Sequence, residues 1–177
     1  MHPRGSLFPD TDAWFGSRGS FFDFFPASGS FECNPPFVDS LMTRNVAHIE
    51  NVLSASEKPL SFVVFVPPWN TCDSYRASQR SKFLRRFVTL PRRRHKYVGA
   101  LHAQTGTRFT LGRACCGCRY RDGMQHRVPR DTWDANVDSF VFWLQNDAGH
   151  RKWPVNDDTV KEFLAVALCH QRKPGRG

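Results

Sequence analysis

The residues whose types and spacing could do chemistry stand together at positions 34–37, which read Asn-Pro-Pro-Phe. Two consecutive prolines fix φ twice and supply no backbone N–H, so the turn is rigid and its carbonyls can accept hydrogen bonds from a ligand. The Asn34 amide adds an acceptor and a donor, and the Phe37 ring adds a flat apolar face. The candidate catalytic residues are therefore Asn34, Pro35, Pro36 and Phe37.

The exocyclic amine of an adenine fits such a receiver. Its two N–H donors require two acceptors, which the Asn34 side-chain oxygen and the Pro35 carbonyl supply. Stacking of the base on Phe37 adds about 1–3 kcal/mol. A site built to accept an N–H also rejects analogues that lack one. The same four residues fit a plain Pro-Pro turn after a strand equally well, and the motif by itself does not separate the two interpretations.

A strand, a helix and a second strand must position this motif. Residues 30–33 are predicted to form a short strand, and residues 37–54 a helix with one apolar face. The continuous apolar run 60–66 is typical of a strand buried on both faces. Such a βαβ unit has parallel strands, and ligands bind at their carboxyl ends. The motif and residues 67–69, which follow the second strand, should therefore lie side by side.

Three further residues are candidate substrate contacts. Asp39 lies close to the motif, although an acid in the first turn of a helix also stabilises the helix on its own account. Pro67 and Trp69 follow the second strand, where the indole offers another flat surface. An equally acceptable interpretation is that Trp69 only covers the end of the sheet.

The remaining pattern completes an α/β domain. We predict strands over 21–25, 87–90 and 137–144, a short helix over 74–86, a turn at 145–149 and a terminal helix over 157–170. Residues 1–170 then form one partial domain with an insertion at about 98–130, and residues 171–177 form a disordered basic tail. A G-x-G-x-x-G sequence that opens a helix is absent, so the usual dinucleotide fingerprint is not present.

The charge of the chain favours a polyanionic partner. The net charge is +9 and the pI is about 9.7, which favours nucleic acid. The densest positive stretch supplies the candidate contacts to a nucleic-acid backbone, namely Arg76, Arg80, Lys82, Arg85, Arg86, Arg92, Arg93 and Arg94. Each phosphate contact would add to the salt dependence of binding. A solvated loop, or a nuclear-import patch at 92–96, remains an alternative interpretation.

The cysteines and the apolar runs exclude other classes of protein. Six cysteines without a secretory signal are expected to be reduced thiols rather than a disulfide framework. Cys115, Cys116 and Cys118 could ligate zinc, but their spacing lacks a matching second pair, so we predict a loop with exposed thiols and no metal. The longest apolar run, 60–69, is about half of what a membrane span requires, so no membrane is expected.

Ordered blocks along the whole chain resemble one known family, the cap-specific mRNA adenosine N6-methyltransferases, also called phosphorylated CTD-interacting factors. The blocks lie within 7–90 and 139–170 and include residues 8–12, 15–19, 28–32, 34–37, 59–67, 144–147 and 152–153. The motif at 34–37 looks like the (Asn/Asp)-Pro-Pro-(aromatic) pattern of enzymes that methylate exocyclic or amide nitrogens with S-adenosylmethionine.

The resemblance implies a nuclear enzyme. It would use S-adenosylmethionine to methylate N6 of the adenosine next to the 7-methylguanosine cap of mRNA. Residues 34–37 would then hold and stack the target adenine, and the cofactor-binding residues stay unknown. Capped mRNA is the expected partner, together with the phosphorylated C-terminal domain of RNA polymerase II in a longer protein.

Several departures from the family pattern leave alternatives open. The family's WW domain, its helical domain and the upstream half of the methyltransferase core have no counterpart in the sequence pattern, and Pro68 stands where the family usually has an acid. The expected fold is therefore the C-terminal half of a Rossmann-like class I methyltransferase sheet, with parallel strands and flanking helices. The alternatives are a non-catalytic basic RNA-binding remnant of this fold, a DNA adenine methyltransferase and a protein-glutamine methyltransferase, the last disfavoured by the basic stretch.

Overall fold

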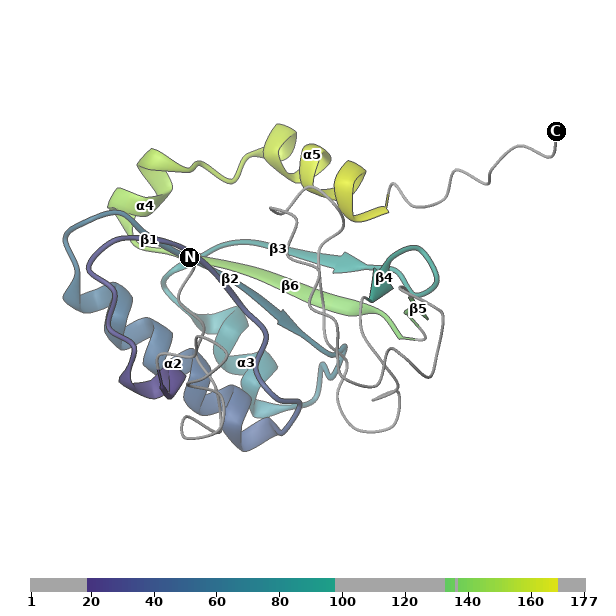
Figure 1. The fold of residues 1–177 in the computed structure, drawn as a ribbon, viewed down its shortest axis with the longest axis horizontal. Helices are drawn as coiled ribbons and strands as arrows, with labels where there is room; N and C mark the ends of the chain where they lie inside the picture. Colours follow the sequence, from purple (N-terminus) through teal and green to yellow (C-terminus); the bar gives the residue numbers. More distant parts are fainter. Residues whose placement is uncertain (1–18, 98–132, 136, 169–177) are drawn as a thin grey trace, which may run out of the picture.

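The computed structural model describes residues 19–97, 133–135 and 137–168. A four-stranded sheet has the order β1-β2-β6-β3, and helices cover both of its faces (Figure 1). The strands are β1 (Gly29–Cys33), β2 (Leu60–Val66), β3 (Leu84–Leu90) and β6 (Ser139–Gln145), with a separate short pair, β4 (Lys96–Tyr97) and β5 (Trp133–Asp134). The helices are η2 (Phe21–Asp23, a 3₁₀ turn), α2 (Asp39–Ala55), α3 (Asp73–Arg80), α4 (Asp147–Lys152) and α5 (Asp157–Leu168).

The strand directions bring three loops to the same end of the sheet. β1 pairs parallel to β2, whereas β6 pairs antiparallel to both β2 and β3. β3 therefore runs in the same direction as β1 and β2. The prediction of parallel strands is confirmed for the β1–β2 pair and is wrong for β6. We call the end where β1, β2 and β3 finish the carboxyl end of the sheet, and the opposite end the amino end.

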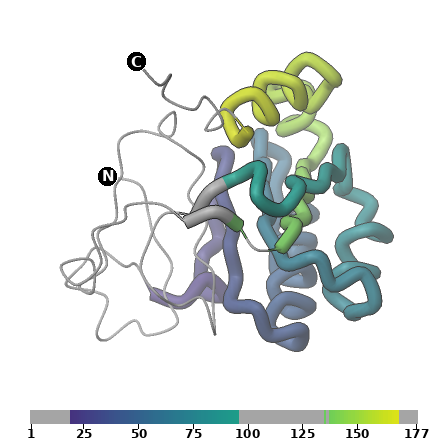
Figure 2. The backbone as a smooth tube through the Cα atoms, turned by 90° about the vertical axis from the view of Figure 1, so that its right-hand side faces the viewer, coloured from purple at the N-terminus to yellow at the C-terminus, as the bar shows by residue number. Residues whose placement is uncertain are grey.

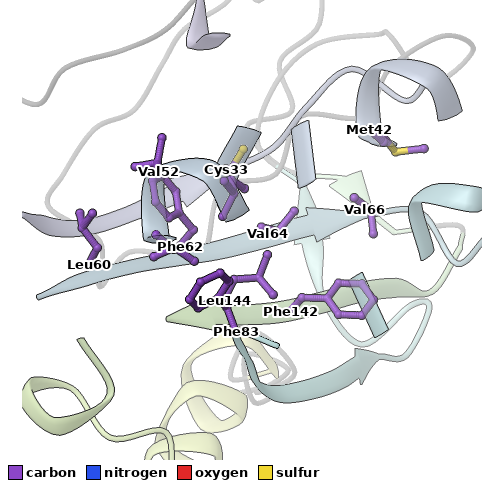
Figure 3. Packing of buried hydrophobic residues seen from close by; sticks show 12 residues of the cluster. Cys33, Met42, Val52, Leu60, Phe62, Val64, Val66, Phe83, Phe142 and Leu144 are labelled. Atoms are coloured by element: carbon purple, nitrogen blue, oxygen red, sulfur yellow. The ribbon is translucent and has the colours of Figure 1, made fainter. Parts of the chain in front are cut away.

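β2 lies at the centre of the core, as its unbroken apolar run predicted. Six of its seven residues are buried. Phe62 and Val64 belong to the cluster formed with α2 (Figure 3). Phe65 belongs to the cluster formed with α5. Burying one such side chain contributes about 1.5–3 kcal/mol. Figure 2, turned by 90°, shows α5 at the top of the molecule and α2 near the bottom.

Helix α2 packs on the sheet through one apolar face. Its buried apolar residues are Met42, Val46, Ile49, Val52 and Leu53, which is the spacing expected for an amphipathic helix. The helix begins at Asp39, two residues later than predicted, because Val38 has an extended backbone with φ −125° and ψ 120°.

Residues 21–25 do not form the predicted strand. Phe21–Asp23 is a 3₁₀ turn, and Ser20 caps its start because the Ser20 hydroxyl accepts the N–H of Phe22 at 3.2 Å. The aromatic rings pack on His48 of α2 instead of alternating across a sheet. The ring centroids of Phe21 and Phe25 lie 5.1 and 5.0 Å from that of His48, and the His48 ring nitrogen Nε2 lies 3.0 Å from the Phe24 carbonyl oxygen.

The predicted helix over 74–86 is too long, and the predicted turn at 145–149 is wrong. α3 ends at Arg80, because Ser81 is extended and its hydroxyl donates to the Glu50 carboxylate of α2. β3 then begins at Leu84 rather than at 87. At the other position, the Asn146 side chain accepts the N–H of Gly149 and caps α4, as asparagine does at many helix N-termini.

The terminal helix is confirmed as α5, which begins at Asp157 as predicted and ends at Leu168. The predicted insertion at 98–130 with Cys115, Cys116 and Cys118, and the predicted tail at 171–177, lie outside the described residues. Within the described ranges, no helix combines the length and apolar character needed to cross a membrane. The same residues contain no group of three or more His, Cys, Asp or Glu side chains arranged to hold a metal ion.

Candidate functional site

The Asn-Pro-Pro-Phe motif lies at the carboxyl end of the sheet, between the last residue of β1 and the first turn of α2. Cys33 ends β1 opposite Val64 of β2, so the motif begins where pairing with β2 stops. The N–H of Val38 donates to the Pro36 carbonyl at 2.8 Å and closes the turn. The Pro35 carbonyl thus stays the predicted second acceptor for a ligand amine.

The side-chain oxygen of Asn34 is the most informative atom of the site. Oδ1 is buried, and it has no hydrogen-bond partner within the described residues. In that part of the chain only one other buried side-chain oxygen or nitrogen shares this state, the hydroxyl of Thr43 in α2. A buried acceptor without a donor costs about 1–3 kcal/mol. The Asn34 oxygen is therefore suited to an N–H group that arrives with a ligand.

Cys33, next to Asn34, ties the motif to α2. Its Sγ donates to the Asn45 side-chain oxygen at 3.4 Å and accepts from the Asn45 side-chain nitrogen at 3.2 Å. Burial raises the pKa of the Cys33 thiol to about 12, and the nearby Glu32 carboxylate adds to this, although the Asn45 hydrogen bond acts in the opposite direction. The thiol therefore stays protonated and anchors the turn, and it is no nucleophile at neutral pH.

The two aromatic rings predicted to face the ligand are in contact. The Phe37 and Trp69 ring centroids are 6.5 Å apart with an interplanar angle of 71°. Phe37 packs partly on the core, whereas Trp69 is 41% exposed. Because the two planes are close to perpendicular, one base cannot lie flat on both rings. A base stacked on one ring meets the other at its edge, which limits how far the base can slide.

Pro67, the other predicted contact after β2, is buried. Its carbonyl accepts the N–H of Trp69 at 2.8 Å, so the segment turns sharply as soon as β2 ends. The structure thus uses Pro67 to set the turn and presents Trp69 at the surface.

Asp39 fixes the position of α3 relative to the motif. Its carboxylate oxygens accept the backbone N–H groups of Ser74 at 3.1 Å and of Asp73 at 3.3 Å. Hydrogen bonds from Ser74, through its side chain and then its backbone, hold the pKa of the Asp39 carboxyl below its ordinary value. The sequence suggested a role within Asp39's own helix, and the cap on a second helix was missed because the contact is not local.

The eight predicted contacts to a nucleic-acid backbone do not form one surface. Arg85 and Arg86, at the amino end of β3, pair with Asp147 and Asp157 and so connect the sheet to α4 and α5. Arg76 pairs with Asp73 at 3.1 Å on the exposed side of α3. Arg80 is the last residue of α3 and Lys82 lies between α3 and β3, and both are exposed near the amino end. The exposed residues Arg92, Arg93 and Arg94 follow β3 at the carboxyl end.

Comparison with known proteins gives a consistent result. The family model described as "Phosphorylated CTD interacting factor 1 WW domain" matches residues 4–100, a region that contains the motif and Trp69. Although this description names a WW domain, the described part of the region forms β1, α2, β2, α3, β3 and β4.

Two curated relatives match most of the chain. Both are named mRNA (2'-O-methyladenosine-N(6)-)-methyltransferase. The protein from Homo sapiens is 37% identical over 165 residues, which is 91% of this chain and 20% of the relative. The protein from Mus musculus is 36% identical over 174 residues, which is 96% of this chain and 21% of the relative. The chain spans about a fifth of the length of these relatives. It belongs to the phosphorylated CTD interacting factor 1 family.

Proposed function

We propose that this chain forms part of the catalytic domain of an mRNA methyltransferase that adds a methyl group to N6 of the adenosine next to the 7-methylguanosine cap. The observation that carries the proposal is the buried Asn34 oxygen, which has no partner among the described residues, together with the Phe37–Trp69 pair. The two relatives carry the name of this activity. A nuclear location, and the phosphorylated polymerase C-terminal domain as a partner of the longer protein, belong to the same proposal.

The sheet supports the assignment to the Rossmann-like methyltransferase class. Three strands run parallel, and the last strand in sequence, β6, is inserted antiparallel between β2 and β3. This arrangement is typical of the C-terminal half of a class I methyltransferase sheet. The motif then occupies the end of the sheet at which open α/β folds bind their ligands.

In the proposed reaction the chain's own residues bind and orient the amine. The adenine N6 group donates one N–H to the Asn34 oxygen and the other to the Pro35 carbonyl, while the ring stacks on Phe37. These acceptors draw the protons away from the nitrogen and leave its lone pair directed at the methyl carbon. If a bound S-adenosylmethionine supplied its methyl group to this nitrogen, one amine proton would pass to solvent.

S-adenosylmethionine is the methyl donor in this proposal and would supply an electrophilic methyl carbon. The site's chemistry fits such a donor, because a methyl group that is already activated requires no strong side-chain base. Neither the Cys33 thiol, which stays protonated, nor the Asp39 carboxylate, which is engaged with α3, offers one.

The test is transfer of a labelled methyl group from S-adenosylmethionine to a capped oligonucleotide that begins with 2'-O-methyladenosine. Calorimetry first measures whether the chain binds S-adenosylmethionine. Asn34→Ala is expected to abolish transfer, whereas Asn34→Asp keeps an acceptor and is expected to retain part of it. Asn51→Ala, the same change at an exposed position of α2, serves as the matched control and should behave as the unmodified chain.

A folded chain that binds both S-adenosylmethionine and the capped RNA but transfers no methyl group would overturn the proposal. Such a result would favour a non-catalytic RNA-binding module. Equal transfer by the Asn34→Ala and Asn51→Ala variants would also contradict it, because the Asn34 oxygen would then have no role in holding the amine.

A further inference from the structure

Three consecutive arginines occupy the turn that follows β3 at the carboxyl end of the sheet. Arg92, Arg93 and Arg94 are all exposed. β3 is parallel to β1 and β2, so this turn lies at the same end as Asn34 and Trp69. The strand order places these residues in sequence along that end, with Asn34 after β1, Trp69 after β2 and the arginines after β3.

The backbone of this turn is held in place by several hydrogen bonds. The N–H of Arg92 donates to the Asp138 carboxylate at 2.7 Å, that of Arg93 to the Ala135 carbonyl at 2.7 Å, and that of Arg94 to the Pro91 carbonyl at 3.2 Å. Arg93 has φ +62°, a left-handed conformation that few residues other than glycine adopt. Backbone strain of this kind persists only where the surroundings enforce it, and it is frequent at binding sites.

The buried side chain of His95 fixes the base of the same turn. Its Nδ1 lies 2.8 Å from the Pro91 carbonyl oxygen, and its Nε2 lies 3.1 Å from the Ser139 hydroxyl. The Pro91 carbonyl can only accept, so Nδ1 carries the hydrogen. The turn that carries the three exposed arginines is thus ordered before any ligand arrives, which lowers the entropy cost of binding.

We propose that Arg92, Arg93 and Arg94 bind the phosphates of the RNA that continues beyond the target adenosine. This inference rests on the function proposed above. Three inter-strand spacings separate β1 from β3, which amounts to about 14 Å, a distance that a few nucleotides cross. Trp69 follows β2, between the two positions, and its ring could stack on a base of this RNA segment. Planar guanidinium groups bind phosphate oxygens in pairs of hydrogen bonds.

The proposal divides the basic stretch into two parts with different roles. Arg85 and Arg86 are engaged with acids of α4 and α5 and hold the fold together. The arginines at 92–94 follow the carboxyl end of β3, where the motif also lies, whereas Arg76, near the start of α3, already pairs with Asp73. Their position, rather than the number of charges, should therefore decide their effect on RNA affinity.

The experiment compares two variants that remove the same number of charges. R92A/R93G/R94A removes the proposed contacts, with glycine at 93 because it tolerates the positive φ. K58A/R151A/K152A removes three exposed charges near the amino end of the sheet. The Kd for a capped oligonucleotide of about ten nucleotides, within the range of single-strand sites, is measured by fluorescence anisotropy over a series of salt concentrations. Circular dichroism verifies that each variant is folded.

We expect the slope of log K against log salt to become shallower by about 2 in R92A/R93G/R94A, because each lost single-strand phosphate contact removes about 0.7. The K58A/R151A/K152A slope should match that of the unmodified chain. A cap dinucleotide ending at the adenosine should bind R92A/R93G/R94A and the unmodified chain equally well, since it does not reach the turn.

Equal slopes in the two triple variants would overturn the inference, as would an equal loss of affinity for the dinucleotide. Binding of a phosphorylated peptide of the polymerase C-terminal domain is measured in parallel. If R92A/R93G/R94A weakens binding of this peptide but not of RNA, the turn is assigned to that partner instead. The assay requires no methyl transfer. A chain that binds RNA through this turn and binds S-adenosylmethionine but transfers nothing would keep the inference and end the proposed function.

Discussion

Two asparagines at opposite ends of the sheet are both largely buried, yet their hydrogen bonding differs completely. Asn146, at the amino end, is 6% exposed. Its oxygen accepts the N–H groups of Leu60 at 3.1 Å and Gly149 at 2.7 Å, and its nitrogen donates to the carbonyls of Ser56 and Lys58, both at 2.8 Å. Asn34, at the carboxyl end, buries an oxygen that has no partner in the described part of the chain.

Asn146 stabilises the fold, whereas Asn34, under the proposed function, accepts a hydrogen bond from the ligand. Asn146 satisfies its amide completely and joins the α2–β2 loop, β2 and α4. Burial of the Asn34 oxygen without a donor destabilises the folded protein, and a hydrogen bond from a ligand N–H group would remove this penalty. The free energy of unfolding should therefore respond very differently to substitution at the two positions.

Asn146→Ala should have the largest effect. It leaves two buried backbone N–H groups and two carbonyls without partners, so we expect a loss of about 3–5 kcal/mol in the free energy of unfolding. Chemical denaturation monitored by circular dichroism measures it. A loss no larger than that of Asn51→Ala would show that Asn146 does not hold these three elements together.

His95→Asn should have an intermediate effect, of about 1–2 kcal/mol, because one of the two hydrogen bonds of the buried ring is lost. Burial lowers the pKa of His95, and the Pro91 hydrogen bond and Asp138 oppose this shift only partly. The unfolded chain therefore binds the proton more readily than the folded one. Stability should be constant above about pH 6.5 and should fall as the pH drops below that value.

Unfolding of the unmodified chain and of the His95→Asn variant, measured between neutral and mildly acidic pH, checks this dependence. The part of the pH dependence contributed by His95 should vanish in the variant. Identical pH profiles for the two proteins would mean that another group is responsible.

Asp39→Asn should have a smaller effect, because asparagine keeps one acceptor oxygen for the α3 N-terminus and loses the charge. The Asp39 pKa is lowered in the folded state, so the carboxylate stabilises the protein above its unfolded pKa of about 3.9 and ceases to do so as the pH falls through the folded pKa. The variant should therefore melt at a lower temperature at neutral pH. The gap between the two melting temperatures should narrow in acid, and a constant gap would contradict the cap.

Asn34→Ala should have the smallest effect on stability. Removing an acceptor that has no partner should leave the free energy of unfolding within about 0.5 kcal/mol, or raise it slightly. The same variant is expected to lose methyl transfer. A large destabilisation would show that the Asn34 amide is part of the fold, as the Asn146 amide is.

Local patterns were sufficient to predict the elements that matter most for the site. The strand Leu60–Val66 and the helix α2 could each be predicted locally. Burial of both faces of a strand leaves an unbroken apolar run, and burial of one face of a helix leaves apolar residues at helical spacing. That Asn34 carries a hydrogen-bond acceptor follows from its residue type, and its role in holding an amine stays a prediction. That its oxygen is buried and unpartnered could not be predicted, because this depends on everything that packs around it.

The errors arose where distant residues decide the structure. Five residues rich in phenylalanine favour a strand by propensity, yet Phe21–Asp23 packs as a turn because His48 of α2 offers an aromatic partner. The insertion of β6 between β2 and β3 leaves no trace in the sequence of any one of these strands. Likewise, no local pattern shows that Arg85 and Arg86 pair with acids that are more than 60 residues away along the chain.

The position of β6 has a consequence for how this protein is made. β3 pairs only with β6 within the four-stranded sheet, so on the ribosome β3 has no neighbour until the strand that ends at Gln145 has been synthesised. β1, α2 and β2 can associate earlier, which leaves an exposed edge of β2 during translation. Closing the loop between β3 and β6 costs only about 0.6 kcal/mol for each doubling of its length. Lengthening that loop during evolution would therefore delay assembly more than it would weaken the finished sheet.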